Sequence, residues 1–492
     1  MSSPSEHSVS TVVDVDDKEN VVVARPAASD DSAANRAAAA ADAPAKPAPK
    51  VPAAVVWAKE HMVTASVFTP ASTLVIILLT SIVAAFYGLG YLGVLWDPQS
   101  HLPNVKVGFV NADAGFNFSA YPPAFAQAVL QQTGGRTIGQ VVEATLLAPS
   151  SAAAGLFNWQ NLTGVPHDDL VNRVNNNELW NVVYIPANFS DVFLLNFNFG
   201  KPQTQLVFMN IENIYDQARQ MSVVSIINAV LTAIVQTFSN AFAQKLLTSI
   251  NTNPVDNITI SAPNIRLIAN NLHPIPNFGH NFATYVICIV LWLSGLVTAT
   301  LLSVIYMIRL PFLKQHGIAT HLRTPTRIIL SAQTVSLLLS FLHALVAWGV
   351  YCGFVGSPTS GFNPDYNSFV VLMYTWFIAA TFHSVALCLC VLLGKDNYSL
   401  IFSLLLILQL ATSSAILDPD VMVGFAKVTY GLPLYYANRS LKCMILGTSC
   451  SFMPFNTGIM AIWFVGMSAI TFVVGRRNVF RTRTAVNKAE TA

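Results

Sequence analysis

Two histidines lie deep within apolar stretches of the sequence, where they could carry protons. His343 follows the middle of a charge-free run at about 328–352, and His383 lies near the middle of another at about 369–394. Histidine changes charge near neutral pH, so the rings could form a proton-titrating pair on a transport path, or stay neutral and hydrogen-bonded to neighbours. The neighbours available for such bonds include Ser336, Thr381 and Ser384. In both cases the rings must point into a helical bundle, because a polar ring facing lipid is costly.

Six cysteines in 492 residues are too few for a disulfide scaffold, but one pair could be bonded. Cys443 and Cys450 fall in a segment that we expect outside the membrane, where the sequence permits either a disulfide or two free thiols. Asn-x-Ser/Thr sequences mark candidate glycosylation sites in segments with the same expected location. These sites are Asn117, Asn161, Asn188, Asn257 and Asn438.

The sequence lacks the motifs of common catalytic, nucleotide-binding and metal sites. Gly394-Lys395-Asp396 has neither the leading glycine nor the hydroxyl residue of a phosphate-binding loop. No Gly-x-Ser-x-Gly, His-Glu-x-x-His or Cys-x-x-Cys motif is present. Lys and Arg number 26 against 24 Asp and Glu, which is too balanced for a general nucleic-acid binder. We therefore expect no enzyme, no cofactor, no metal and no nucleic-acid partner.

The composition indicates a membrane protein whose main partner is the lipid bilayer. Hydrophobic residues make up 53% of the chain and charged residues only 10%. Soluble globular proteins carry about 25% charged residues. A membrane span needs about 20 apolar residues, and six charge-free runs reach that length. The runs are about 70–95, 283–308, 328–352, 369–394, 398–417 and 457–475.

A seventh charge-free stretch, 220–244, is predicted to form a helix of about 213–249 outside the membrane. Ser225, Asn228, Thr232, Gln236 and Ser239 recur at spacings of three and four, which places polar side chains along one helical face. Such a stripe is typical of a helix packed on a soluble domain. A membrane-spanning helix here is the alternative.

The positive-inside rule gives the expected orientation. The segment 309–327 contains basic residues and no acidic one, and 476–492 contains more basic than acidic residues. Both segments are therefore predicted to be cytoplasmic. Six spans then place the N-terminus inside and put 97–282 and the loop 418–456 outside. The outer segment 97–282 carries seven basic and ten acidic residues, in agreement with this side.

The expected fold is a polytopic α-helical membrane protein with six transmembrane helices and an α+β extracytoplasmic domain between helices 1 and 2. The domain occupies 97–282, with strands expected at 105–111, 180–185, 205–210 and 258–268 from their β-branched and aromatic residues. Residues 66–96 form helix 1, and 283–475 hold helices 2–6. The Ala- and Pro-rich segment 1–65 is expected to be a disordered cytoplasmic tail.

Four short motifs, in this order, resemble those of one family of membrane proteins. They are Trp96-Asp97-Pro98 with Val110-Asn111-Ala112-Asp113-Ala114-Gly115, then Tyr184-Ile185-Pro186-Ala187-Asn188-Phe189-Ser190, then His273-Pro274-Ile275-Pro276-Asn277-Phe278-Gly279, and Gly431-Leu432-Pro433-Leu434-Tyr435-Tyr436-Ala437 with Arg439. The chain is similar, over about 66–478, to the type-2 permease domains of ABC transporters. It resembles the branch without a fused ATPase that includes the bacterial phage-infection protein and the fungal nitrosoguanidine-resistance proteins.

The resemblance implies export of small or lipophilic molecules, or drug resistance, at the plasma membrane. Type-2 permeases build their path between two membrane halves, so it also implies a homodimer, in which Gly88, Gly90 and Gly93 of helix 1 could allow close helix approach. Energy would come from a separate ATPase docking on 309–327 or from a proton gradient. The alternative function is a non-transporting regulator of membrane lipid distribution, or a receptor whose outer domain binds a partner.

Overall fold

The computed structural model describes most of the chain beyond the first apolar run. The described residues are 97–147, 153–199, 207–252, 258–260, 264–275, 278–305, 325–355, 365–394, 397–413, 417–422 and 424–491, together with Leu78 and Ser81. By its internal contacts the chain divides into Met1–Leu78 and Leu79–Ala492, and the account below concerns the second unit.

Several predictions from the sequence fall outside the described residues. They concern the tail at 1–65, nearly all of helix 1 with its three glycines, most of the loop 309–327, and Asn257.

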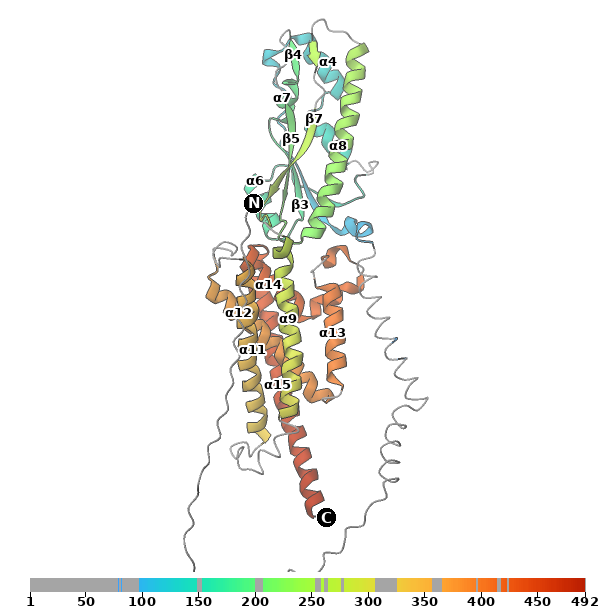
Figure 1. The fold of residues 1–492 in the computed structure, drawn as a ribbon. Helices are drawn as coiled ribbons and strands as arrows, with labels where there is room; N and C mark the ends of the chain where they lie inside the picture. Colours follow the sequence, from blue (N-terminus) through green and yellow to red (C-terminus); the bar gives the residue numbers. More distant parts are fainter. Residues whose placement is uncertain are drawn as a thin grey trace, which may run out of the picture. The chain divides into compact units, whose positions relative to one another are not determined.

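Residues 97–275 form an α+β domain, called here the sheet domain (Figure 1). The five strands of its main sheet lie in the order β2-β1-β3-β5-β7. The β3–β5 pair is antiparallel, and the other three pairs are parallel. The strands are β1 Lys106–Asn111, β2 Asn158–Asn161, β3 Asn181–Ile185, β5 Phe208–Tyr215 and β7 Asn264–Asn271. A separate antiparallel pair joins β4 Phe197–Phe199 to β6 Ile258–Ile260. The helices are α4 Pro123–Thr133, α5 Ile138–Leu147, α6 His167–Asn175, α7 Phe189–Leu194 and α8 Met221–Thr252.

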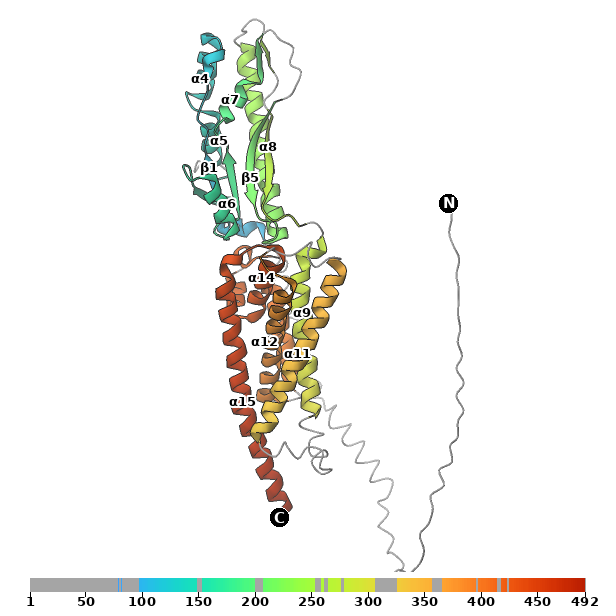
Figure 2. The same cartoon turned by 90° about the vertical axis from the view of Figure 1, so that its left-hand side faces the viewer.

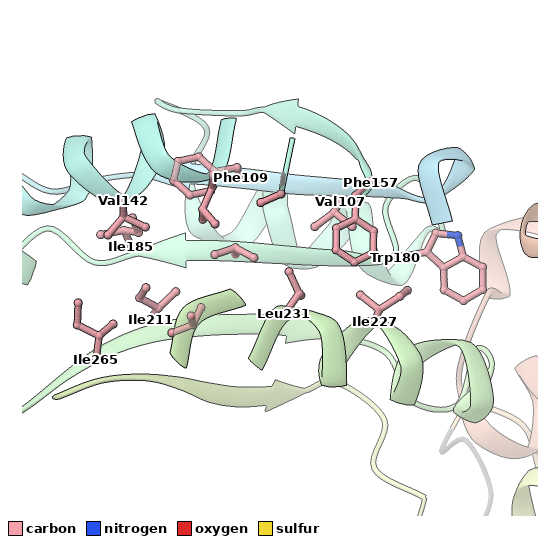
Figure 3. Packing of buried hydrophobic residues seen from close by; sticks show 14 of the residues in the cluster. Val107, Phe109, Val142, Phe157, Trp180, Ile185, Ile211, Ile227, Leu231 and Ile265 are labelled. Carbon is pink, nitrogen blue, oxygen red and sulfur yellow. The ribbon is translucent and has the colours of Figure 1, made fainter. Parts of the chain in front are cut away.

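Both faces of the sheet are covered by helices. Alternate residues of each strand point to opposite sides, so each strand contributes to both packed layers. On one face Phe109 and Ile185 pack with α5, α7 and α8 in a single core (Figure 3). On the other face Val110 and Val182 pack with Leu170 of α6. Because both faces are covered, β1 and β3 are buried along nearly their whole length, which explains the β-branched and aromatic residues that predict them.

Helix α8 packs against the sheet, as its polar stripe predicts. Val223, Ile227, Leu231 and Val235 recur every four residues and are all buried in the sheet-domain core. Figure 3 shows Ile227 and Leu231 turned toward the strands. By length and apolar composition alone α8 would also qualify as a membrane span, over Met221–Lys245.

The polar stripe of α8 is divided between water and the sheet. Ser225, Thr232 and Gln236 are exposed. Asn228 Oδ1 accepts hydrogen bonds from Nδ2 of Asn181 on β3 (2.8 Å) and Nδ2 of Asn213 on β5 (2.8 Å). The stripe therefore joins the helix to two strands.

Two predicted boundaries in the sheet domain are wrong. The strand expected at 205–210 extends to Tyr215 as β5, so the helix expected from 213 begins at Met221. β5 stays extended because it pairs with β3 on one side and β7 on the other. The strand expected at 258–268 is two strands, β6 and β7, which belong to different sheets.

Four long apolar helices correspond to four of the expected spans: α9 Phe278–Ser303, α11 Pro325–Val355, α12 Ser368–Leu393 and α15 Met453–Thr491. All four have the length and composition of membrane spans. Figures 1 and 2 show them side by side. We call them the bundle. Contacts are most numerous around α12, which lies among α9, α11 and α15.

The helix at the fifth expected span, 398–417, is shorter than the prediction. Helix α13 covers only Tyr398–Thr412, about 22 Å at 1.5 Å per residue, against a hydrocarbon core of about 30 Å. Its last turn holds Gln409, whose Oε1 accepts a hydrogen bond from the N–H of Leu434 (3.0 Å). The apolar residues after Thr412 include Leu417, which packs with the sheet domain instead of extending the helix.

The loop expected at 418–456 is folded and attached to the sheet domain. It contains the 3-10 helices η4 Pro419–Val421, η5 Gly424–Gly431 and η6 Cys450–Phe452, and α14 Pro433–Leu446. Val421, Met422 and Ala426 are buried in the same core as β1 and α8. The sheet domain and this loop therefore share one hydrophobic core.

Candidate functional site

The two histidines of the bundle lie against each other. His343 comes from α11 and His383 from α12, and their ring centroids are 5.3 Å apart. His383 is 1% exposed, whereas His343 is half-buried. Helices α11 and α12 therefore bring the two residues together.

The ring of His383 is held between two other helices. Its Nε2 lies 2.9 Å from Oγ of Ser294 on α9, and its Nδ1 lies 3.3 Å from the carbonyl oxygen of Ser336 on α11. A carbonyl oxygen only accepts, so Nδ1 carries a proton. The Ser294 hydroxyl also lies 2.8 Å from the carbonyl oxygen of Leu291, so its single proton is shared between that oxygen and Nε2 of His383. Of the partners named from the sequence, Ser336 contacts the ring through its backbone. Thr381 and Ser384 instead donate to carbonyls of their own helix.

Close packing of α9 on α12 depends on Gly295. A Cβ at this position would lie 3.2 Å from the carbonyl oxygen of Phe382 and 3.4 Å from Cδ2 of His383. The missing side chain therefore lets the neighbouring Ser294 reach His383.

His343 has an unused ring nitrogen. Its Nδ1 is buried and has no hydrogen-bond partner among the described residues. A buried polar atom without a partner is costly, and such atoms often mark functional positions.

A groove of about 240 Å³ opens between α11, α12 and α15, next to the histidine pair. Its apolar lining includes Leu330, Leu337 and Phe464. Its polar lining consists of Gln333, Thr334, Ser336, Ser384, Ser468 and Thr471. Gln333 donates from Nε2 to the carbonyl of Ser468 (2.7 Å) and so ties α11 to α15. The groove offers both apolar contact and hydrogen-bonding groups within the bundle.

A second polar site, which the sequence did not indicate, lies where the sheet domain meets α14. We call Arg219, Asp418, Asp420, Arg439 and Lys442 the junction cluster. They line one cavity of about 200 Å³. Their signal in the sequence is weak, because they come from three segments that lie far apart along the chain.

Arg219 is the centre of the junction cluster. Its guanidinium lies 3.5 Å from the ring centroid of Trp180, and its Nη2 lies 3.6 Å from Oδ2 of Asp420. Trp180 also donates from Nε1 to Asp420 (3.3 Å). Lys442 donates from Nζ to the carbonyl of Arg219 (2.8 Å) and to Oε1 of Gln220 (2.9 Å). These bonds connect α14 and η4 to the residues that precede α8.

Burial controls the protonation of the junction cluster. It lowers the pKa of Lys442 to about 8, against the opposing effect of Asp418 and Asp216. Burial also lowers the pKa of Arg219 and raises that of Asp418. Burial and the nearby carboxylates therefore act in opposite directions on the pKa of Lys442.

Two of the resembling motifs meet in the sheet domain. The carboxylate of Asp113 accepts bonds from the Ser190 hydroxyl (2.6 Å) and from the N–H groups of Ser190 (3.0 Å), Gly139 (2.8 Å) and Gly115 (3.3 Å). A Cβ at Gly139 would lie 2.4 Å from Oδ1 of Asn111. Asp113 thus ties the loop after β1 to the starts of α5 and α7, which is a structural role.

Cys443 and Cys450 form a disulfide that ties α14 to η6. Among the candidate glycosylation sites, Asn117, Asn161 and Asn188 are exposed on the sheet domain. Asn438 is 1% exposed, accepts from Oγ1 of Thr284 (2.8 Å) and donates to the carbonyl of Ser413 (3.4 Å). Asn438 is therefore far less accessible to a glycan than the three exposed sites.

Comparison with known proteins places the chain in a family. Residues 74–469 match the family described as "Protein of unknown function (DUF3533)". The chain belongs to this family. No curated protein matches the chain. The family match and the apolar helices together identify a multi-pass membrane protein of this family, and the similarity to type-2 permeases stays a prediction.

Proposed function

We propose that this protein exports small lipophilic molecules and carries out no enzymatic chemistry. The observation that supports the proposal is the groove between α11, α12 and α15, which has an apolar and a polar lining in the same space. Ligand sites of this kind bury an apolar body and orient it with a few polar groups. An amphiphilic molecule could pack on Leu330 and Phe464 while Gln333 or Ser384 bonds its polar end.

The histidine pair offers a way to drive this export with a proton gradient. Ser336 lines the groove, and its carbonyl contacts His383, so groove and histidines share a residue. A proton taken up by the pair would change the charge next to the groove. The other source is a separate ATPase on the basic loop 309–327.

The proposed orientation has the sheet domain outside and both termini in the cytoplasm, in the plasma membrane. The basic residues of 309–327 and 476–492 support this orientation.

Efflux of a fluorescent amphiphilic dye from vesicles containing only this protein tests the proposal. With a proton gradient and no ATP, wild-type protein should release the dye faster than protein-free vesicles. Ser468→Leu fills the groove and should reduce the rate about tenfold or more, because an occupied site excludes the substrate. Ala469→Leu, one residue further on an exposed position of α15, is the matched control and should leave the rate unchanged.

Equal rates with and without protein, under both a proton gradient and added ATP with a cell extract, would contradict the proposal. That result would favour the non-transporting alternative, a receptor or a regulator of lipid distribution.

A further inference from the structure

The cavity at the junction cluster is lined by more positive than negative charge. Arg219, Arg439 and Lys442 contribute three positive charges, and Asp418 and Asp420 two negative ones, a net charge of +1. The remaining lining residues, Asn177, Tyr430, Tyr435, Asn438 and Ser449, are neutral. The cavity of about 200 Å³ is large enough for a small polar group, since one water needs only about 10–15 Å³ of such space.

Both carboxylates already have partners within the protein. Asp420 pairs with Arg219 and accepts from Nε1 of Trp180. Asp418 accepts from the N–H of Asp420 (3.1 Å) and so begins η4. Neither carboxylate is within 4.0 Å of Arg439 or Lys442 among the ion pairs of the described residues.

Arg439 and Lys442 are therefore two cations at one cavity that form no ion pair within 4.0 Å among the described residues, and Asp418 and Asp216 act on Lys442 only from a greater distance. They are three residues apart on α14, so they lie on the same side of the helix. Lys442 is 5% exposed, and both of its hydrogen-bond acceptors are neutral. Arg439 lies with its guanidinium 3.8 Å from the ring centroid of Phe452 and contacts the hydroxyl of Tyr435 (3.4 Å). Burying a charge is costly unless a counter-charge accompanies it.

We propose that this cavity binds a phosphate group, carried by a phospholipid headgroup or by a soluble phosphate ester, with Arg439 and Lys442 as its ligands. One negative charge would neutralise the lining. The planar guanidinium of Arg439 suits two phosphate oxygens, and Lys442 adds a point charge. Oδ1 of Asn177 is buried without a partner among the described residues and could accept from a hydroxyl of the ester.

Binding by the delipidated full-length protein in detergent tests this inference. The probes are sn-glycerol 3-phosphate, a short-chain phosphatidylglycerol, and a diacylglycerol of the same chain length that lacks phosphate. At least one phosphate probe should bind, and the diacylglycerol should not compete. Arg439→Gln should weaken phosphate binding about tenfold or more, because the variant loses the charged hydrogen bonds from the guanidinium to the phosphate oxygens.

Matched variants separate ligand binding from a general loss of charge. Arg266→Gln removes an exposed arginine of β7 outside the cavity and should leave binding unchanged. Arg439→Lys keeps the charge and should recover part of the phosphate affinity that Arg439→Gln loses. This comparison leaves the buried Lys442 unchanged, so it does not depend on whether a variant of Lys442 folds. Tighter binding of phosphatidylglycerol than of glycerol phosphate would identify a lipid headgroup as the source, and equal or weaker binding a soluble ester. Absence of binding by both phosphate probes, or an equal loss in Arg266→Gln, would overturn the inference.

Discussion

At the residue scale, the polar side chains of this apolar chain fall into two kinds. Asp113 has every bond that it needs from its own domain, since three N–H groups and a hydroxyl surround its carboxylate. His343 and Lys442 differ, because one has an unused nitrogen and the other has only neutral acceptors. Satisfied residues of this type stabilise the fold, whereas incompletely satisfied ones are candidates for function.

Asp113→Ala should destabilise the sheet domain. The change leaves the N–H groups of Gly139 and Ser190 without their acceptor, and the loss should be about 2–3 kcal/mol. The thermal unfolding midpoint of the full-length protein in detergent should fall by several degrees. Asp168→Ala, at a fully exposed carboxylate, is the control and should leave the midpoint unchanged. A midpoint of Asp113→Ala equal to that of the control would contradict the assigned role.

The double variant His343→Gln, His383→Gln should abolish any pH dependence of export while the protein still folds and reaches its membrane. Glutamine keeps hydrogen-bonding groups for Ser294 and Ser336 but cannot titrate. Dye efflux measured between pH 5.5 and 8 gives the profile. A double variant that retains the wild-type profile would reject the proton-transfer role and leave a packing role for both rings.

At the element scale, α8 and α13 show the limits of apolar length as a criterion. α8 is long and apolar enough to span a membrane, yet its apolar residues are buried against the sheet. α13 starts in an apolar run of sufficient length but ends at Thr412, where the chain turns to the sheet domain. Packing on the sheet domain therefore places α8 and sets where α13 ends.

A cysteine at Gln236 should react with a membrane-impermeant maleimide on intact cells. The side chain is exposed on α8, in the domain expected outside. The experiment uses a background in which Cys288, Cys352, Cys388 and Cys390 are replaced. Leu338→Cys, at a position of α11 that is 65% exposed on the bundle surface, should face lipid and stay unlabelled. Labelling of Gln236→Cys only after permeabilisation would reverse the orientation, and no labelling at all would favour α8 in the membrane.

Much of the fold is predictable from the sequence because the dominant patterns are local. Charge-free runs predict α9, α11, α12 and α15, and β-branched residues predict β1 and β3. The boundary between β5 and α8 was missed because strand pairing on both sides keeps residues up to Tyr215 extended. His343 and His383 were recognisable because ionisable nitrogen is rare in apolar runs. The junction cluster was not, since its members meet only through the tertiary fold.

At the scale of the whole molecule, the sheet domain and the loop between α13 and α15 act as one packed unit. Val421 and Met422 lie in the sheet-domain core, and Lys442 bonds the residues that precede α8. α14 in turn contacts α9 through the bond between Thr284 and Asn438. α14 therefore contacts both the sheet domain and the bundle.

We propose that the working unit is a homodimer, because the permeases that the chain resembles form their path between two membrane halves. Mass photometry in mild detergent should show a species of twice the protein mass after subtraction of the micelle, and crosslinking in native membranes should give the same species. Mass photometry needs no crosslinker, and crosslinking in native membranes needs no detergent, so the two measurements do not share an artefact. Monomer alone in both would contradict the proposal.

The most direct test of the central claim is to locate the exported molecule on the protein. An amphiphilic compound that the protein exports, fitted with a diazirine, is photolysed in vesicles, and the labelled peptides are identified by mass spectrometry. The account predicts labels on residues that line the groove, such as Leu337, Ser384 and Phe464, which excess unlabelled compound removes and Ser468→Leu prevents. Labels confined to lipid-facing positions such as Val465 and Val473, unaffected by competitor, would contradict it.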